Sequence, residues 1–194
     1  MTYTELLDTA PDIVDAPDAV AVEHLRGAIT FEGATFGYTP NQTVLRDINL
    51  AIAPGETGAF VGTYGAGKTT ICSLIPRFYD VDAGRIAIDG IDIRRMTLAS
   101  LRRQIGVVTQ ETVLFDDLSV AENVYLGHAP RTKLGTVDWT KMRFEARQTL
   151  DAMGAQHIDE TARLRDLSIA NKHLVAVARA LSIDAEVVIM DEPT

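Results

Sequence analysis

The sequence predicts an α/β domain that has an antiparallel β subdomain, a core with a parallel sheet and an inserted helical subdomain. Three observations support this prediction. Apolar residues alternate along the first third of the chain, a glycine-rich motif follows them, and a mostly helical stretch precedes a final apolar run at 187–190. With 194 residues, of which 46% are hydrophobic and 23% charged, the chain is long enough to bury one core.

Residues 1 to about 27 are expected to form an acidic lead-in or linker, and the domain is expected to span 28–194. The lead-in carries six carboxylates against one arginine and shows no sustained periodicity. The net charge of −9 argues against a nucleic-acid partner, because a nucleic-acid-binding face has to be basic. The single Cys72 excludes an internal disulfide and indicates a reducing compartment.

Three strands are predicted before the glycine-rich motif. The stretch 28–38, AITFEGATFGY, alternates apolar and smaller residues, and 44–55, VLRDINLAIAPG, repeats the alternation before a Pro-Gly turn. The stretch 57–62, TGAFVG, is predicted to be a short apolar strand that ends at Gly62.

The period changes after Gly67. Apolar residues at 71, 74, 75 and 78 fall on one face of a helix. A hairpin is predicted with its turn at Asp89-Gly90, then a short helix over 97–104 and a buried strand that runs to Gln110. About 117–182 is expected to form the helical subdomain, and 186–190 a final buried strand.

The motif itself, GTYGAGKTT at 62–70, matches G-x-x-x-x-G-K-[ST] in full. Its glycines let backbone N–H groups point at phosphate oxygens, Lys68 places a cation on the β- and γ-phosphates, and the Thr69 hydroxyl ligates Mg²⁺. The core is therefore predicted to be of the P-loop NTPase (RecA-like) type. The predicted nucleotide-binding residues of the loop are Gly62, Thr63, Tyr64, Gly65, Ala66, Gly67, Lys68, Thr69 and Thr70.

The loop has two other interpretations. A glycine-rich turn between a strand and a helix can exist without any ligand. A dinucleotide-binding G-x-G-x-x-G motif is excluded, because Thr70 occupies the position of its third glycine.

The end of the chain, VVIMDEPT, is predicted to complete the site. Asp191 would hold the metal through water, and Glu192 would act as the general base that polarises the attacking water. Alone, an apolar run that ends in Asp-Glu is more often a strand that meets a polar turn. Its combination with the phosphate-binding motif favours the catalytic interpretation.

These motifs, in this order, resemble the nucleotide-binding domain of ABC transporters over nearly all of 28–194. The resemblance implies that Tyr38 stacks on adenine and that Gln110 reaches the metal and senses a membrane domain. It also implies that Ser168, the second residue of LSIANKHLVAVARAL (167–181), caps the helix that follows and faces the γ-phosphate of a second such domain. The implied ligands are ATP and Mg²⁺.

The chain departs from the family pattern in several ways. Ile169 and Ala170 replace two glycines after Ser168, although sugar importers tolerate a similar replacement, and Tyr64 is bulkier than usual. The part before about 117 resembles exporters and the part after it ribose-type importers, which suggests a mosaic with its junction after Gln110. Family members continue past DEPT to a switch histidine, so the C-terminal strands and that histidine are expected to be missing.

The resemblance implies a subunit of an ABC transporter that binds MgATP and, when a dimer or the missing elements complete its site, hydrolyses it to drive transport. Its implied partners are a second nucleotide-binding domain and a transmembrane domain, which would hold it in the cytoplasm on the inner face of the membrane. Two alternatives stay open: a nucleotide-binding fragment or mosaic without turnover, and a soluble ABC-type ATPase outside transport.

Overall fold

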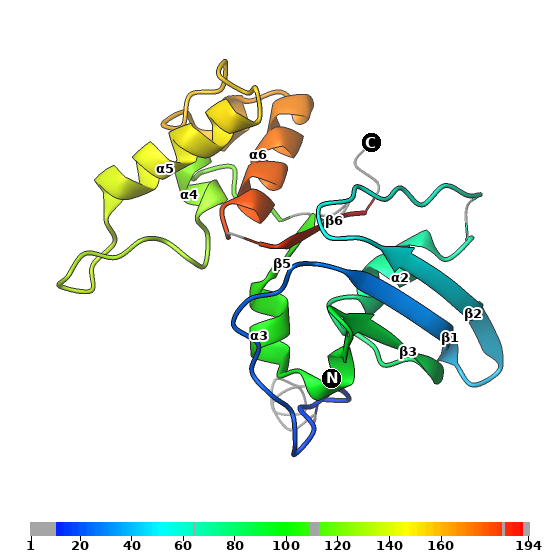
Figure 1. The fold of residues 1–194 in the computed structure, drawn as a ribbon. Coiled ribbons are helices and arrows are strands. Elements are labelled where there is room, and N and C mark those ends of the chain that lie inside the picture. Colours follow the sequence, from blue (N-terminus) through cyan, green and yellow to red (C-terminus); the bar gives the residue numbers. More distant parts are fainter. Residues whose placement is uncertain (1–10, 64, 109–112, 184, 192–194) are drawn as a thin grey trace, which may run out of the picture. The chain divides into compact units, whose positions relative to one another are not determined.

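The computed structural model describes residues 11–63, 65–108, 113–183 and 185–191 (Figure 1). The chain divides into two compact units, Met1–Arg102 and Arg103–Thr194. The first unit contains the glycine-rich motif. The described part of the second unit contains three α-helices and Asp191.

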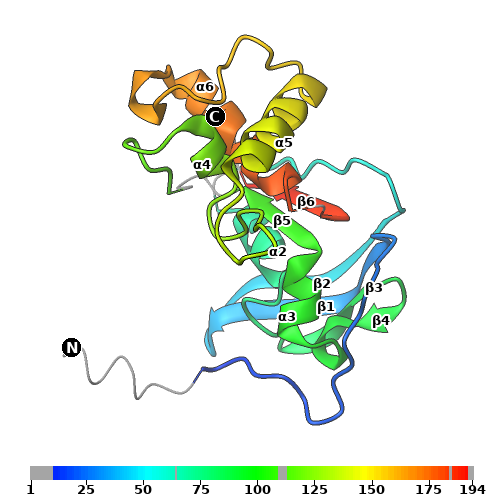
Figure 2. The same cartoon turned by 90° about the vertical axis from the view of Figure 1, so that its left-hand side faces the viewer.

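A four-stranded antiparallel sheet forms the first unit, with the strand order β2-β1-β3-β4. Its strands are β1 (Ile29–Thr39), β2 (Gln42–Ile52), β3 (Ala83–Ile88) and β4 (Ile91–Asp92). The central strand β1 pairs with β2 on one side and with β3 on the other (Figure 2). The first two predicted strands and the antiparallel β subdomain are therefore confirmed.

The predicted hairpin turn at Asp89-Gly90 is also confirmed. Ile88 pairs with Ile91 across a two-residue turn in which both Asp89 (φ 51°) and Gly90 (φ 81°) are left-handed. Positive φ at both central residues is what a type I′ turn requires. The Asp89 carboxylate also accepts hydrogen bonds from the backbone N–H groups of Arg26 and Ala28.

The strand predicted over 57–62 is not formed. These residues have no regular secondary structure, and the Val61 side chain is 95% exposed. A short apolar strand is stable only when neighbouring strands satisfy its backbone and cover its side chains. Among the described residues, the only sheet of parallel strands is the two-stranded sheet of the second unit, so the apolar pattern at 57–62 has no neighbouring strands to pair with.

The helix predicted after Gly67 forms as α2 (Lys68–Leu74) but is shorter than its apolar pattern suggests. Ile71, Leu74 and Ile75 are buried as predicted, whereas Phe78 is 45% exposed. The chain leaves the helical path at Arg77, whose φ of 55° is left-handed. Because of this change in backbone direction, Phe78 does not continue the buried face of α2.

The remaining elements of this part of the chain are η1 (Ile93–Arg95) and α3 (Leu98–Arg103), the second of which confirms a predicted helix. In this part of the chain the largest fully buried side chains come from the sheet, from α2 and α3 and from the C-cap of η1. They are Phe31, Leu74, Ile86, Ile88, Met96 and Leu101.

The segment 11–27 contains no helix or strand, yet hydrogen bonds attach it to its unit. Val20 forms a parallel bridge with Met96, and the Asp15 carboxylate accepts from the N–H of Leu98 at the start of α3. Leu25 is buried. The boundary expected at about residue 27 stays a prediction, and the structure adds that the lead-in lies against the domain.

In its described residues, the second unit contains a two-stranded parallel sheet and three α-helices. β5 (Ile105–Val108) pairs with β6 (Val187–Met190), so both predicted strands form. The helices α4 (Val120–Val124), α5 (Trp139–Ala152) and α6 (Ile169–Leu181) lie together in Figure 1, with η2 (Leu164–Asp166) before α6.

A contiguous apolar cluster holds these helices together. It consists of Val120, Ala121, Val124, Tyr125, Met142, Ala146, Leu150, Ala155, Ile158, Leu164, Val175 and Ala178. Burial, together with the nearby Glu145 carboxylate, raises the pKa of Tyr125 to about 12. The predicted helical subdomain thus has a core of its own, and its exact limits stay a prediction.

One fully buried polar side chain organises the segment that enters α4. The Asn123 amide accepts from the N–H of Phe115 and donates to the carbonyl oxygens of Phe115 and Ser119. The Arg179 guanidinium of α6 donates to the carbonyl oxygens of Asn123 and Val113. Burial lowers the pKa of Arg179, and these carbonyls compensate for its lost hydration.

The described helices include none that is both long and apolar enough to cross a lipid bilayer.

Candidate functional site

The glycine-rich loop of the first unit is shaped by left-handed glycines. Gly65 has a φ of 79° and Gly67 a φ of 88°. Residues other than glycine adopt such angles only with strain. At Gly67 space is also limiting, since a Cβ atom would lie 2.6 Å from Leu45 Cδ2. The N–H of Ala66 closes a turn onto the carbonyl of Thr63 at 3.1 Å. The backbone therefore curves as a phosphate cradle requires.

Lys68 links the two ends of this loop. Its Nζ donates to the carbonyl oxygens of Gly62, at 3.0 Å, and Thr63, at 3.1 Å. The same residue opens α2, whose N-cap, Gly67, supplies no side-chain hydrogen bond. The first N–H groups of α2 and the ammonium group of Lys68 thus belong to the same short segment, where both could bind one anion.

Thr69 and Thr70 lie next to each other but in different surroundings. Thr69 is exposed, and its carbonyl accepts from the Ser73 hydroxyl. Thr70 is buried, and its hydroxyl lies 3.2 Å from the hydroxyl of Tyr38. The structure therefore brings Tyr38, the predicted base-stacking residue, into direct contact with the loop's helix. Tyr64, also predicted in this loop, lies outside the described residues.

Leu45 and Tyr79 belong to the surroundings of this loop and were not predicted from the sequence. Leu45 fills the space in front of Gly67. Tyr79 packs its ring against that of Tyr38, with 5.2 Å between the centroids. Neither residue is part of a motif, and only the folded structure shows that they lie near the loop.

In the second unit, parallel pairing determines where Asp191 lies. Val108 is the partner of Met190 at the carboxyl ends of β5 and β6, and the N–H of Asp191 donates to the carbonyl of Val108 at 2.9 Å. Gln110 follows β5 by two residues, and Glu192 follows Asp191. Both lie outside the described residues, so their roles stay predictions.

A Mg²⁺ ion was predicted with ligands from both units. Thr69 belongs to the first unit and Asp191 to the second, so their joint coordination of one ion stays a prediction. The described residues contain no group of three His, Cys, Asp or Glu side chains that could hold a metal. A hydroxyl and one carboxylate nevertheless fit Mg²⁺, which keeps several waters and takes further oxygen ligands from nucleotide phosphates.

Ser168 is the N-cap of α6, so the prediction that it caps this helix is confirmed. Its hydroxyl accepts from the N–H of Asn171 at 3.3 Å. The side chain of Ile169, which stands where the family usually has glycine, is 76% exposed. The predicted contact of Ser168 with a γ-phosphate stays a prediction.

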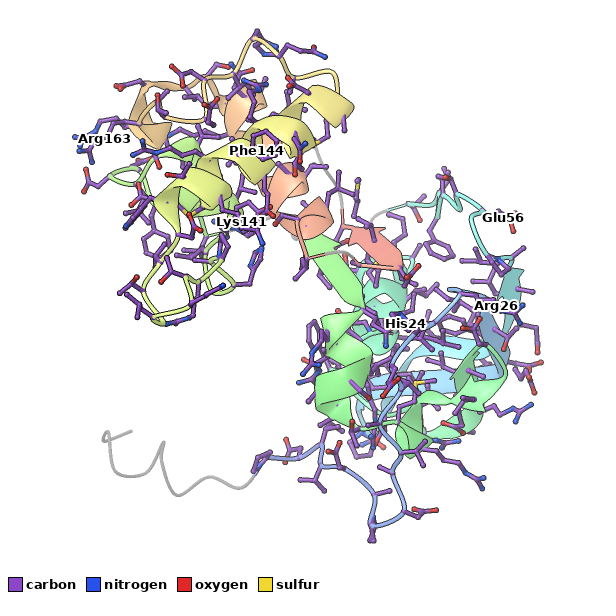
Figure 3. All side chains as sticks on the ribbon, turned by 60° about the vertical axis from the view of Figure 1, so that its left-hand side comes forward. His24, Arg26, Glu56, Lys141, Phe144 and Arg163 are labelled. Carbon is purple, nitrogen blue, oxygen red and sulfur yellow. The ribbon has the colours of Figure 1, made fainter. Side chains whose placement is uncertain are left out.

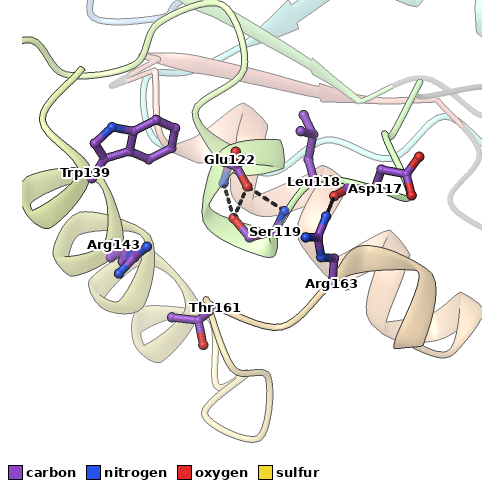
Figure 4. Close-up of a pocket in the computed structure, with 8 residues that line it drawn as sticks. All are labelled: Asp117, Leu118, Ser119, Glu122, Trp139, Arg143, Thr161 and Arg163. Atoms are coloured by element: carbon purple, nitrogen blue, oxygen red, sulfur yellow. Dashed lines mark hydrogen bonds between the residues drawn. The ribbon is translucent and has the colours of Figure 1, made fainter. Parts of the chain in front are cut away.

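The second unit also contains a cleft of about 300 Å³ (Figure 4). Ser119 and Glu122 form the capping box of α4 there, and the hydrogen bond from Ser119 holds the pKa of Glu122 below its usual range. Arg163 donates to the carbonyl of Asp117. These polar groups bind one another, and the cleft includes none of the predicted site residues. Its lining is Asp117, Leu118, Ser119, Glu122, Trp139, Arg143, Thr161 and Arg163.

The exposed side chains of α5 are not among the predicted site residues either. Figure 3 marks Lys141 and Phe144 on this helix, and Phe144 is 62% exposed. No residue of α5 was predicted to bind nucleotide.

Comparison with known proteins identifies the family. The sequence model of the ABC transporter family matches residues 45–194, which include the glycine-rich loop, α6 and Asp191. The chain belongs to the ABC transporter family. This ABC transporter domain therefore has the fold class and the family predicted from its sequence.

The relatives of this ABC transporter domain include importer and exporter components, as its two-part sequence predicts. Ribose import ATP-binding protein RbsA 1 of Rhizobium meliloti (strain 1021) is 48% identical over 171 residues, covering 88% of this chain and 34% of the relative. The ATP-dependent lipid A-core flippase of Syntrophus aciditrophicus (strain SB) is 40% identical over 190 residues, covering 97% and 31%. The mosaic junction itself stays a prediction.

A solved structure agrees with this assignment. A bacterial Atm1-family ABC exporter with ATP bound matches with a TM-score of 0.80 and 31% identity, covering 97% of this chain and 33% of the exporter chain. The chain thus spans about a third of the length of the relatives that it matches.

Proposed function

We propose that this ABC transporter domain binds MgATP with the loop at 62–70 and that the binding drives transport through a membrane partner. The observation that carries the proposal is the position of Lys68. Its ammonium group lies within hydrogen-bond distance of the carbonyls of Gly62 and Thr63, so it joins the two ends of the curved loop that contains Gly65 and Gly67. A triphosphate that enters this curve would meet a cation and backbone N–H groups together.

The other site residues would complete the nucleotide site. Tyr38 would stack on the base, because its half-exposed ring is tied to Thr70. Thr69, Gln110 and Asp191 would hold Mg²⁺, which neutralises phosphate charge, and Glu192 would take the proton from the attacking water. Thr63, Tyr64 and Ala66 would contribute loop backbone.

The proposed partners are a second nucleotide-binding domain and a transmembrane domain. In this arrangement Ser168 of one domain would face the γ-phosphate held by the other. Binding of two ATP molecules would close the pair and hydrolysis would reopen it, because the closed state has the higher affinity for ATP. Such a domain would work in the cytoplasm, at the inner face of the membrane.

Binding is tested by titrating MgATP into the chain and into the Lys68→Ala variant. We expect the Kd to rise about 10- to 100-fold in the variant, because charge-assisted hydrogen bonds to phosphate are lost. Lys133→Ala is the matched control, since it removes the same charge from an exposed loop. Equal affinity of all three proteins would reject the proposed site.

Hydrolysis is tested separately by the rate of phosphate release in the presence of saturating MgATP. If Glu192 is the general base, Glu192→Gln lowers this rate while MgATP binding is kept. A rate that is the same in both proteins favours a nucleotide-binding domain without turnover.

A further inference from the structure

Three aromatic rings meet beside the glycine-rich loop. The Phe36 and Tyr38 centroids are 5.0 Å apart with an interplanar angle of 83°, and those of Tyr38 and Tyr79 are 5.2 Å apart at 89°. Phe36 and Tyr79 complete the triangle at 5.5 Å. Edge-to-face contacts at these distances are the favourable geometry for aromatic pairs.

The three rings differ in their exposure. Phe36 is 4% exposed, whereas Tyr38 is 51% and Tyr79 is 43% exposed. Phe36 is therefore the packed base of the cluster. Tyr38 and Tyr79 both reach the surface, where the ring of Tyr38 keeps area that is free to meet a ligand.

The Tyr38 ring is held from two directions. Its hydroxyl lies 3.2 Å from the buried hydroxyl of Thr70, which connects its far end to α2. Tyr79 lies perpendicular to it and blocks rotation of its ring plane in one direction. A stacking residue that is already oriented loses less entropy when a base binds.

Tyr79 is itself firmly placed, because its neighbours are fixed. Arg77, whose backbone is left-handed, forms a bidentate ion pair with Asp80. Its Nε lies 2.7 Å from Oδ1 and its Nη2 lies 3.0 Å from Oδ2. On the other side, the N–H of Phe78 donates to the carbonyl of Ser73, and the Arg102 guanidinium lies 5.2 Å from the centroid of the Phe78 ring. The turn at 77–80 therefore presents the Tyr79 ring in one position.

We propose that Tyr79 is a positioning residue for nucleotide-base recognition, acting through the ring of Tyr38. This inference rests on the proposed function, since it concerns the base end of the same nucleotide site. The aromatic ring of Tyr79 carries the effect, and its hydroxyl is not required. Tyr79 thus contributes to the affinity for the base and not to the affinity for the phosphates.

The test compares two ligands, MgATP and Mg-tripolyphosphate, which share the phosphates but not the base. In Tyr79→Ala we expect the Kd for MgATP to rise about three- to ten-fold and the Kd for tripolyphosphate to stay unchanged. Tyr79→Phe keeps the ring and restores the affinity for MgATP. An equal loss for both ligands, or no loss for MgATP, overturns the proposal.

A double-mutant cycle separates positioning from a general effect on folding. If Tyr79 acts through Tyr38, then Tyr79→Ala has no further effect on MgATP binding when Tyr38→Ala is already present. Additive losses in the double variant overturn the proposal. Thermal unfolding of each variant shows that the comparison is made on folded protein.

The same titrations distinguish a failure of this inference from a failure of the proposed function. Loss of binding of both ligands in Lys68→Ala supports the phosphate site, whatever Tyr79 does. If the unmodified chain binds neither ligand, the proposed function and this inference are both wrong. If it binds both and Tyr79→Ala behaves as the unmodified chain does, only the inference is wrong.

Discussion

The starts of α2 and α6 were both predicted to face nucleotide phosphate, but they are built differently. The N-cap of α2 is Gly67, which is left-handed and supplies no side-chain hydrogen bond. The N-cap of α6 is Ser168, which has extended backbone and accepts from the N–H of Asn171 through its hydroxyl. One helix start therefore lacks a partner from its N-cap side chain, and the other has one.

This difference separates a binding role from a structural role. A helix start that its own N-cap side chain does not satisfy needs water or a ligand for its N–H groups. A helix start with a serine cap is already stabilised. The α2 start thus depends on its backbone conformation to form a site. The α6 start is stabilised by its serine cap, and only the remaining hydrogen-bonding capacity of the Ser168 hydroxyl would be available to a phosphate.

The largest effect is expected from Gly67→Ala. Alanine would have to adopt a φ near 88°, and its Cβ would lie 2.6 Å from Leu45 Cδ2, so Leu45 would have to move. We expect the free energy of unfolding to fall by about 1–3 kcal/mol and MgATP binding to weaken at least about ten-fold as the loop N–H groups are displaced. Urea unfolding and calorimetric titration measure the two effects.

Gly65→Ala is the matched control for this prediction. Gly65 is equally left-handed, with a φ of 79°, but a Cβ there would have no described atom within 4 Å. Its cost should be limited to backbone strain, about 1–2 kcal/mol. If Gly65→Ala is as damaging as Gly67→Ala, then the contact with Leu45 does not matter.

A smaller effect, of a different kind, is expected from Ser168→Ala. Loss of the cap should lower the free energy of unfolding by about 1 kcal/mol. Binding of MgATP to the isolated chain should not change, because Ser168 is proposed to act on the nucleotide of a second domain. Ser168→Asn, which can still cap the helix, should recover the stability. A weaker affinity for MgATP in the single chain would contradict this division of roles.

The same contrast shows what the sequence could and could not predict. The Gly-rich loop, the turn at Asp89-Gly90 and the serine cap of α6 were predictable because each depends on a few neighbouring residues with defined backbone preferences. The segment 57–62 was predicted wrongly because strand formation depends on pairing partners that are far away in the sequence. For the same reason no pattern revealed that Leu45 and Tyr79 surround the loop.

The smallest predicted effect concerns the other end of α6, where a titratable side chain contacts the C-cap residue. His128 Nε2 lies 2.8 Å from the hydroxyl of Ser182, the C-cap of this helix. Burial is the main cause that lowers the pKa of His128 from its usual value of 6.5, and Arg179 adds to it. The unfolded chain therefore binds a proton at a higher pH than the folded chain does.

The sign of the pH dependence follows from this difference. The contribution of His128 to stability is present above pH 6.5 and is lost as the pH falls through 6.5 toward the lower pKa of the folded chain. We expect the urea midpoint to fall over this interval, and to fall less in His128→Gln. His173→Gln is the control, because it removes a histidine from α6 itself. If His128→Gln and the unmodified chain have the same pH dependence, the C-terminal end of α6 does not rely on the neutral imidazole.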